Sequence, residues 1–134
     1  MIKPDAYKNM GKILSRIEEE GFILSNLKLF RFGLGEAQGF YAEHRGKPFF
    51  EELTSFMASD FALGMELIAE NVIQKWRSLI GPTNCQVARV DAPNSIRAQF
   101  GTSGVRNACH GSDASKPRML LFKMLYYVIF CWKG

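Results

Sequence analysis

The sequence predicts an α+β fold of the ferredoxin-like type, with element order βαββαβ and a four-stranded antiparallel sheet on which the helices pack. Three observations lead to this prediction. Stretches with apolar residues at helical spacing alternate with shorter β-prone stretches. They follow the order strand, helix, strand, two short helices, strand, helix, loop, strand. The 134 residues fit one domain with its own core, and no linker rich in Pro, Gly or Ser divides them.

The N-terminal part supplies the first helix and a long strand. Residues 10–20 carry apolar side chains at helical spacing, between Asn9 as the N-cap and Gly21 as the terminator. Residues 22–32 are dense in apolar and β-prone side chains and predict a strand. Its apolar face shifts near Leu29, which indicates a bulge or bend at that point.

The middle of the chain predicts two short helices, a strand and a longer helix. The short helices occupy residues 36–44 and 48–57, the second beginning at a proline. Residues 62–68 alternate apolar side chains and predict a strand. The longer helix has Asn71 as its N-cap and ends at the Gly81-Pro82 pair.

The last third is predicted to be mostly loop. Residues 82–95 contain prolines and turn-forming Asn and Asp, and predict a long structured loop of the kind that often carries function. Residues 95–100 predict one short helical turn. Residues 105–110 predict the last short strand.

Composition narrows the class of partner and the compartment. The net charge is +4 and no long Lys/Arg run occurs, so an anionic small molecule such as a nucleotide is favoured over nucleic acid. The three cysteines match neither a zinc site nor a disulfide framework, and no signal peptide is recognised, which favours a reduced, cytoplasmic location. The apolar residues 119–132 are too few to span a bilayer, which needs about 20.

The strongest chemical signal is the segment Asn107-Ala108-Cys109-His110-Gly111-Ser112-Asp113. A lone histidine is usually an ordinary surface or core residue. His110, however, ends a predicted strand, Gly111 allows a sharp backbone turn, and Ser112 is close enough to orient the ring. A neutral imidazole is a good nucleophile and a good leaving group near neutral pH.

This segment resembles the active-site signature of nucleoside diphosphate kinases. Four further segments resemble motifs of that family, in the family's order, so the resemblance covers about residues 2 to 115. They are Ile2-Lys3-Pro4-Asp5, Arg45-Gly46-Lys47-Pro48-Phe49-Phe50, Trp76-Arg77 through Thr83, and Pro93 through Gly101. Residues 81–92 form a longer loop than in the short-chain enzymes and resemble those of divergent members that occur as domains of axonemal or centrosomal proteins.

The resemblance implies a phosphotransfer reaction with one covalent residue. His110 would take the γ-phosphate of a nucleoside triphosphate as phosphohistidine and pass it to a nucleoside diphosphate, in a ping-pong cycle. Mg²⁺ would enter with the nucleotide, bridging phosphate oxygens rather than occupying a protein cage. The implied nucleotide-binding residues are Lys3, Arg77, Arg97 and Thr83 for phosphate, Asn107 for the sugar, Phe49 for the base, and Tyr41 near the histidine, with Ser112 in a supporting role.

Taken singly, each of these residues also has an ordinary structural explanation. One of Phe49 and Phe50 belongs to the core, and His44 is expected only in a polar turn. Asp5 is expected to brace the loop of Lys3. Cys109 should point into the core, because neighbours on a strand face opposite ways. No Gly-x-x-x-x-Gly-Lys loop is present, which excludes a P-loop kinase.

Three departures from the family put full activity in doubt. The chain begins at the family's first motif, so part of the first strand is missing, and Ser59-Asp60-Phe61 replaces a Ser-Gly-Pro turn. The family's glutamate eleven residues after the histidine, which orients the ring, is replaced by Leu121. Residues 1–115 are therefore predicted to form the kinase domain and residues 116–134 a divergent hydrophobic tail, with activity reduced or lost.

The tail has more than one physical interpretation. It packs on the sheet as a substitute element, or it is an exposed and aggregation-prone segment, with membrane attachment as a third option.

Two classes of function remain open at this stage. The first is an active nucleoside diphosphate kinase. The second is a weak or non-catalytic nucleotide-binding domain of a ciliary or centrosomal assembly, associated with the cytoskeleton. RNA binding on the sheet is disfavoured, because no aromatic-rich strand motif of the required kind occurs. A homo-oligomer is compatible with the family, but the sequence does not fix the oligomeric state.

Overall fold

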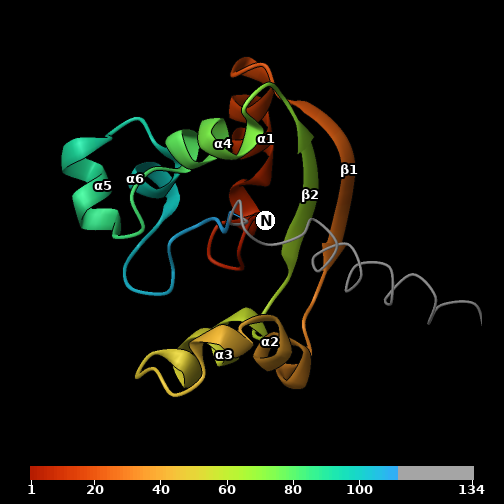
Figure 1. Cartoon of the computed structure of the whole chain (residues 1–134), viewed down its shortest axis with the longest axis vertical. Helices are drawn as coiled ribbons and strands as arrows, with labels where there is room; N and C mark the ends of the chain where they lie inside the picture. Colours follow the sequence, from red (N-terminus) through yellow and green to blue (C-terminus); the bar gives the residue numbers. More distant parts are fainter. Residues whose placement is uncertain (112–134) are drawn as a thin grey trace, which may run out of the picture.

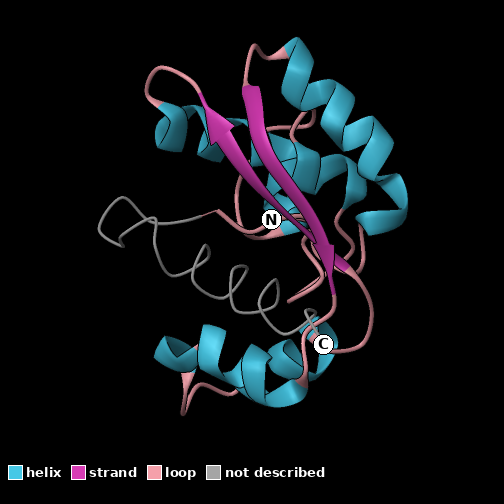
Figure 2. Cartoon of the chain, turned by 90° about the vertical axis from the view of Figure 1, so that its right-hand side faces the viewer, coloured by secondary structure: helices cyan, strands magenta, loops and turns pink. Residues whose placement is uncertain are grey.

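The computed structural model describes residues 1–111. Its fold is α+β and is built on a two-stranded antiparallel sheet (Figures 1 and 2). Strand β1 spans Ile23–Phe30 and strand β2 spans Ala62–Ile68. Their register pairs Ile23 with Ile68 and Phe30 with Ala62. Strand β2 has the predicted bounds, and β1 lies within residues 22–32, where a strand was predicted.

The bulge in the sheet lies at Ser25 rather than near Leu29, where it was predicted. The Ser25 hydroxyl contacts the Glu66 backbone oxygen at 3.4 Å and donates to the Glu66 carboxylate at 2.8 Å. A polar side chain with a partner on the next strand therefore accommodates the extra residue, while Leu29 keeps its regular pairing with Leu63.

The inner edge of the sheet is continued by single bridges. Ile2 pairs antiparallel with Leu63 on β2 and with Cys109 near the end of the described chain. The Ile2 and Leu63 amides each donate to the other's carbonyl, at 2.8 and 2.9 Å. The described residues thus hold two strands and bridges in place of four full strands. The predicted strand 105–110 is reduced to a bridge because Ala108 has a φ of +66°, which interrupts an extended backbone.

Helices α1 and α4 cover one face of this sheet (Figure 1). Helix α1 spans Met10–Glu19 and α4 spans Val72–Ile80. Gly21 ends the first helical segment with a φ of +76°, a conformation that glycine adopts without steric cost. Asn9 and Asn71 occupy the predicted N-cap positions, although neither side chain makes a capping hydrogen bond.

The first core lies between that face and the helices. Ile13 and Ile17 of α1 meet the α4 side chains there, and the Phe22 and Trp76 rings pack edge to face at 6.2 Å. The short helix α6, Ile96–Phe100, adds Ile96 and is capped by the Ser95 hydroxyl, which accepts from the Ala98 amide. Burial of these side chains supplies the main driving force for folding.

A second core holds a helical hairpin at the ends of the strands (Figure 1). The hairpin comprises α2, Leu34–Phe40, the 3₁₀ turn η2, Ala42–His44, and α3, Phe50–Met57. A second 3₁₀ turn, η1, spans Tyr7–Asn9 before α1. The hairpin core contains Met1, Phe32, Ala37, Tyr41, Phe50, Leu53, Phe56, Met57 and Ala62.

The predicted loop 82–95 contains a helix that the sequence did not indicate. Helix α5 spans Cys85–Asp91 and is capped by the Asn84 side chain, which accepts from two amides. Only the small residues Cys85 and Ala88 are buried, while Val90 is 80% exposed. The apolar pattern therefore does not mark a buried helical face, which is why the prediction of a loop was wrong.

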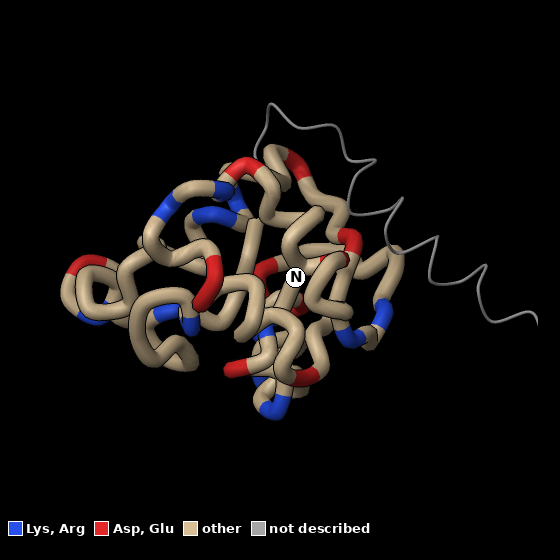
Figure 3. The backbone as a smooth tube through the Cα atoms, turned by 90° about the horizontal axis from the view of Figure 1, so that it is seen from below, with Lys and Arg blue, Asp and Glu red and all other residues tan. Residues whose placement is uncertain are grey.

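Within residues 1–111, no helix is long and apolar enough to cross a membrane. Basic and acidic positions are interspersed along the described backbone (Figure 3). The expectations for the tail, residues 116–134, lie outside the described residues.

Candidate active site

A cleft of about 660 Å³ separates the two cores and brings the predicted site residues together. Every predicted residue in the described part of the chain lines it, and Ser112 lies outside that part. These residues come from the N-terminal segment, from the positions just before η2 and α3, from α4 and the loop after it, from α6, and from the final segment. The predicted members are Lys3, Tyr41, Phe49, Arg77, Thr83, Arg97, Asn107 and His110.

His110 sits half-buried on the inner wall of the cleft. Its amide donates to the Met1 carbonyl at 2.9 Å, and its ring meets Phe40 and Tyr41 with centroids 5.5 and 5.8 Å away. Burial, helped by the Met1 amino group and Lys3, lowers the pKa of His110 to about 3. The imidazole is therefore neutral at physiological pH and keeps a lone pair for attack on an electrophile.

The position next to His110 has room only for glycine. A Cβ at this position would lie 2.9 Å from Trp76 Cδ1, on the indole ring of α4. The glycine therefore lets the backbone pass directly over Trp76, which holds His110 close to the first core.

Lys3 brings a buried cation to the same wall. It is 5% exposed, and its ammonium donates to the Val105 carbonyl at 3.0 Å and to Asn107 Oδ1 at 2.8 Å. Burial lowers the pKa of Lys3 to about 8. Asn107 in turn donates to the Thr83 carbonyl at 3.1 Å, so the cation and the amide are fixed together.

Arg97 supplies a second buried cation. It is 9% exposed, and its guanidinium donates to the Gly81 carbonyl at 2.9 Å and to the Cys109 carbonyl at 3.0 Å. Its Nε is buried without a hydrogen-bond partner among the described residues. An arginine held by two carbonyls presents its remaining donors in a fixed direction, which suits an anion with several oxygens.

The opposite wall is exposed. Phe49 is 38% exposed at the mouth of the cleft, whereas its neighbour Phe50 is 9% exposed and belongs to the hairpin core. This confirms the prediction that one ring of the pair is core. Arg77, on α4, and Thr83, on the loop after it, are also exposed.

His44 belongs to the cleft, although the sequence pattern placed it only in a polar turn. Its ring stacks on Tyr41 with centroids 6.1 Å apart and lies 5.5 Å from Phe49. Its Nδ1 and the Tyr41 hydroxyl are buried without hydrogen-bond partners among the described residues. The spacing Tyr41, His44, Phe49 on one side of the hairpin is the signal that could have found it.

Asp5 acts on the final segment rather than on the loop of Lys3, where it was expected to act. Its Oδ2 accepts from the Ala108 amide at 2.9 Å. Cys109 is completely buried in the first core, as the predicted alternation required. The N-terminal segment thus contacts the His110 segment through both backbone and side chain.

The described residues offer no cluster of three or more His, Cys, Asp or Glu that could hold a metal ion. The cleft presents the cations and the neutral histidine described above, together with two separate carboxylates, Glu43 and Glu52. This donor set fits a divalent ion carried by the phosphates of a bound nucleotide, and it does not fit a metal held by protein carboxylates.

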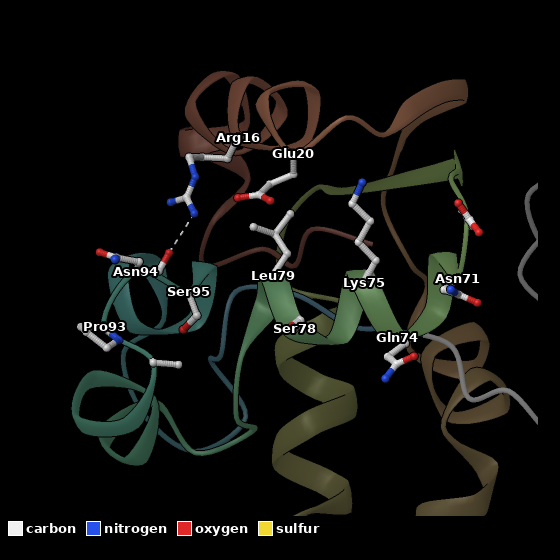
Figure 4. Close-up of a pocket in the computed structure, with 12 residues that line it drawn as sticks. Arg16, Glu20, Asn71, Gln74, Lys75, Ser78, Leu79, Pro93, Asn94 and Ser95 are labelled. Atoms are coloured by element: carbon white, nitrogen blue, oxygen red, sulfur yellow. Dashed lines mark hydrogen bonds between the residues drawn. The ribbon is translucent and has the colours of Figure 1, made fainter.

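A second cleft, of about 650 Å³, lies between α1, α4 and residues 92–95 and contains none of the predicted site residues (Figure 4). Arg16 crosses it to donate to the Asn94 carbonyl at 2.9 Å. Its lining mixes both signs of charge, with Glu20 just after α1 and Lys75 on α4. The chemistry described above is confined to the first cleft.

Known proteins are similar to this chain both in sequence and in fold. A nucleoside diphosphate kinase from Aquifex aeolicus is 48% identical over 136 aligned residues, covering 100% of this chain and 92% of that protein. A solved structure of the Aquifex aeolicus enzyme has a TM-score of 0.81 at 44% identity, covering 99% of this chain and 92% of that one. A nucleoside diphosphate kinase from Halobacterium salinarum, solved in complex with CDP, has a TM-score of 0.79 at 34% identity, covering 87% and 76%.

A longer relative is also similar. Nucleoside diphosphate kinase homolog 7 of Rattus norvegicus is 42% identical over 113 residues. That alignment covers 84% of this chain, which spans only 29% of the relative's length.

The comparisons place this α+β fold, with its histidine-lined cleft, in one family of proteins. The family model described as nucleoside diphosphate kinase matches residues 1–126, and the chain belongs to that family. The predicted family is thereby confirmed.

Proposed function

We propose that this domain transfers the γ-phosphate of a nucleoside triphosphate to a nucleoside diphosphate through His110. This proposal rests on one observation: the neutral, half-buried imidazole of His110 lies on the same cleft wall as the buried cations Lys3 and Arg97. The same proposal covers the longer protein of which this domain could form a part, since relatives of both lengths occur.

In the first half-reaction, a ring nitrogen of His110 attacks the γ-phosphorus. The nitrogen–phosphorus bond forms, the bond from phosphorus to the bridging oxygen breaks, and the nucleoside diphosphate leaves with that oxygen. In the second half-reaction, the terminal phosphate oxygen of another diphosphate attacks the same phosphorus, and the nitrogen–phosphorus bond breaks. A ring held neutral by burial is suited both to attack and to leave.

Lys3 and Arg97 hold the phosphates for this exchange. Both are fixed by backbone carbonyls before any ligand arrives, so little reorganisation is needed as charge moves between oxygens. Arg77 and Thr83 complete the phosphate site from the exposed side, and Ser112 supports the histidine. Phosphoryl transfer depends mainly on such positioning and charge neutralisation.

Asn107 and Phe49 hold the rest of the nucleotide. The buried Asn107 amide is fixed by Lys3 and by the Thr83 carbonyl, so it can present a polar edge to a sugar hydroxyl. Phe49 offers an exposed ring face at the mouth, with Tyr41 behind the histidine. Stacking tolerates every base, which fits a kinase that accepts many nucleotides. The CDP complex of the Halobacterium salinarum relative supports nucleotide binding.

The family uses a divalent metal, and we propose Mg²⁺ for this chain. The described residues contain no carboxylate cluster to hold it, so the phosphates bound by Lys3, Arg77 and Arg97 would carry it. When bound, the ion would neutralise negative charge on the transferred group.

The remaining predictions are retained as proposals. The four-stranded ferredoxin-like sheet is supported by the bridges from Ile2 to Leu63 and Cys109. The boundary between residues 1–115 and a divergent tail rests on the sequence. We also propose a homo-oligomer with no nucleic-acid partner, and a cytoplasmic location with cytoskeletal association as an extension.

The second candidate is a nucleotide-binding domain of weak or no activity. The observation in its favour is Leu121 at the position of the family's ring-orienting glutamate, which lies outside the described residues. In that case the cleft would bind nucleotide, but His110 would not be phosphorylated at a useful rate. Replacing residues 116–134 by a family-like helix bearing the glutamate should then raise turnover.

Trapping the phosphate separates the two candidates. The purified protein is incubated with γ-labelled ATP and Mg²⁺, and acid-labile, base-stable label is measured and located by peptide mass spectrometry. We expect label on the wild type and on His44→Gln, and none on His110→Ala. ATP binding without label on the wild type would support the second candidate. Label on His110→Ala would overturn the role of His110.

A further inference from the structure

Two residues before the histidine, the backbone adopts a conformation that alanine rarely takes. Ala108 has a φ of +66° and is completely buried. The Cys109 amide donates to the Asn107 carbonyl at 2.8 Å, which closes a γ-turn with Ala108 at its centre. A γ-turn with positive φ is rare and strained for a residue that has a side chain.

This turn decides which way the neighbouring side chains point. In an extended strand, residues three apart lie on opposite faces, so Asn107 and His110 would diverge. With the turn between them, both line the first cleft, while Cys109 is completely buried in the core. The strained residue therefore places a nucleotide-binding amide and the nucleophile on one wall.

Both peptide groups of Ala108 are held by the N-terminal segment. Its amide donates to Asp5 Oδ2 at 2.9 Å, and its carbonyl accepts from the Lys3 amide at 2.8 Å. The other Asp5 oxygen is buried without a hydrogen-bond partner among the described residues. Burial also raises the pKa of Asp5, so this carboxyl is kept in an unfavourable environment. A buried carboxyl with so few partners is expected to serve a specific contact.

We infer that Asp5 is a positioning residue for phosphoryl transfer, because its carboxylate holds the strained turn at Ala108 and thereby aims Asn107 and His110 into the cleft. This inference rests on the proposed function of His110. Asp5 does not line the cleft itself, so its effect passes through the backbone.

The test compares four forms of the full chain: wild type, Asp5→Ala, Ala108→Gly and the double variant. The rate of His110 phosphorylation is measured in a single turnover and divided by the amount of folded protein that reacts. A misplaced nucleophile can lower a rate by about 100-fold, so we expect Asp5→Ala to lose roughly 10- to 100-fold. In the double variant, the new glycine adopts positive φ without steric cost, and most of the loss should be recovered.

Two further variants separate positioning from stability. Asp5→Asn keeps an acceptor oxygen and should stay close to the wild-type rate. Ile17→Val removes a buried methyl group in α1, away from the turn, and should lower stability with no change in the rate per folded molecule. The chemical shift of the Ala108 amide proton should move in Asp5→Ala and stay in place in Ile17→Val.

The outcomes distinguish this inference from the proposed function. If the wild type accepts no phosphate, the proposed function fails, and the Ala108 amide shift still reports whether Asp5 holds the turn. If folded Asp5→Ala reacts at the wild-type rate, the positioning role is overturned. A lost rate that Ala108→Gly does not recover would also overturn it, because the loss would then act by another route.

Discussion

The two walls of the cleft differ in how far they are organised before a nucleotide binds. The inner wall holds Lys3, Asn107 and Arg97, each less than 10% exposed and hydrogen-bonded to backbone or to each other. The outer wall presents Phe49 and the exposed Thr83. Under the proposed function, the inner wall would fix the reacting phosphate and the outer wall would accommodate variable bases.

Removal of His110, the proposed nucleophile, should have the largest effect on activity. His110→Ala should lower kcat by at least about four orders of magnitude, because no other described residue of the inner wall can carry the phosphate. Nucleotide binding, measured by calorimetry, should persist within about tenfold, since Lys3 and Arg97 remain in place. Loss of binding together with activity would mean that the ring itself shapes the site.

Neutralising the inner wall should have the next largest effect. Lys3→Met should lower kcat about 100-fold or more, because it removes a fixed cation from the transferred phosphate. The free energy of unfolding should change by no more than about 1 kcal/mol, since relief of ammonium burial offsets two lost hydrogen bonds. A large loss of stability in urea unfolding would instead assign Lys3 a structural role.

Substitutions on the outer wall should change KM rather than kcat. Phe49→Ala should raise KM for nucleotides about tenfold and leave kcat within about twofold, because stacking contributes about 1–3 kcal/mol to binding. Phe49→Tyr keeps the ring face and should behave as the wild type. Equal losses in kcat and kcat/KM for Phe49→Ala would show that this wall acts in the transition state.

The two walls should also differ in how their contributions to KM depend on pH. The pKa of Lys3 is lowered to about 8, so free protein loses this charge as pH rises through 8, and KM should rise about tenfold per pH unit above it. While nucleotide binding weakens above this pH, the contribution of Lys3 to folding stability becomes more favourable. The folded state binds fewer protons than the unfolded chain between pH 8 and the ordinary lysine value, so this group favours folding more as pH rises there. Steady-state kinetics from about pH 7 to about pH 9.5 test this, and Lys3→Met should abolish the alkaline rise in KM.

The smallest effect on stability and KM is expected from an exposed ion pair beside the cleft. Arg106 forms a 3.0 Å ion pair with Glu52, and both side chains are about half exposed. Glu52→Gln should therefore change stability by less than about 1 kcal/mol and KM only slightly, with less sensitivity to salt than the wild type. A larger change in KM would indicate that this pair closes the cleft over the nucleotide.

The sequence predicted the residues of the inner wall because they stand in dense, characteristic motifs. It missed His44, which lies in a polar turn by composition and reaches the cleft only through stacking on Tyr41. It also missed the turn at Ala108, since alanine gives no local signal for positive φ. The Ala108 amide donates to Asp5, a partner 103 positions away, and such distant contacts are invisible to local patterns.

The same principle explains the errors in secondary structure. Helix α5 buries only the small side chains Cys85 and Ala88, so its apolar pattern is too weak to recognise. The bulge at Ser25 depends on a contact with Glu66 of the neighbouring strand, which single-strand periodicity cannot locate. By contrast, β2 was predicted with the observed bounds because Leu63, Met65 and Leu67 alternate along it.

The pairing of Ile2 with Leu63 and Cys109 joins the two ends of the described chain. Contacts of such long sequence separation close a large loop and cost more chain entropy than local helices do, so we expect them to form late in folding. We expect a nascent chain to form α1 and the paired strands β1 and β2 before the segment around His110 packs in place. Recovery of phosphorylation during refolding would therefore report the last step of assembly, after far-UV dichroism has recovered.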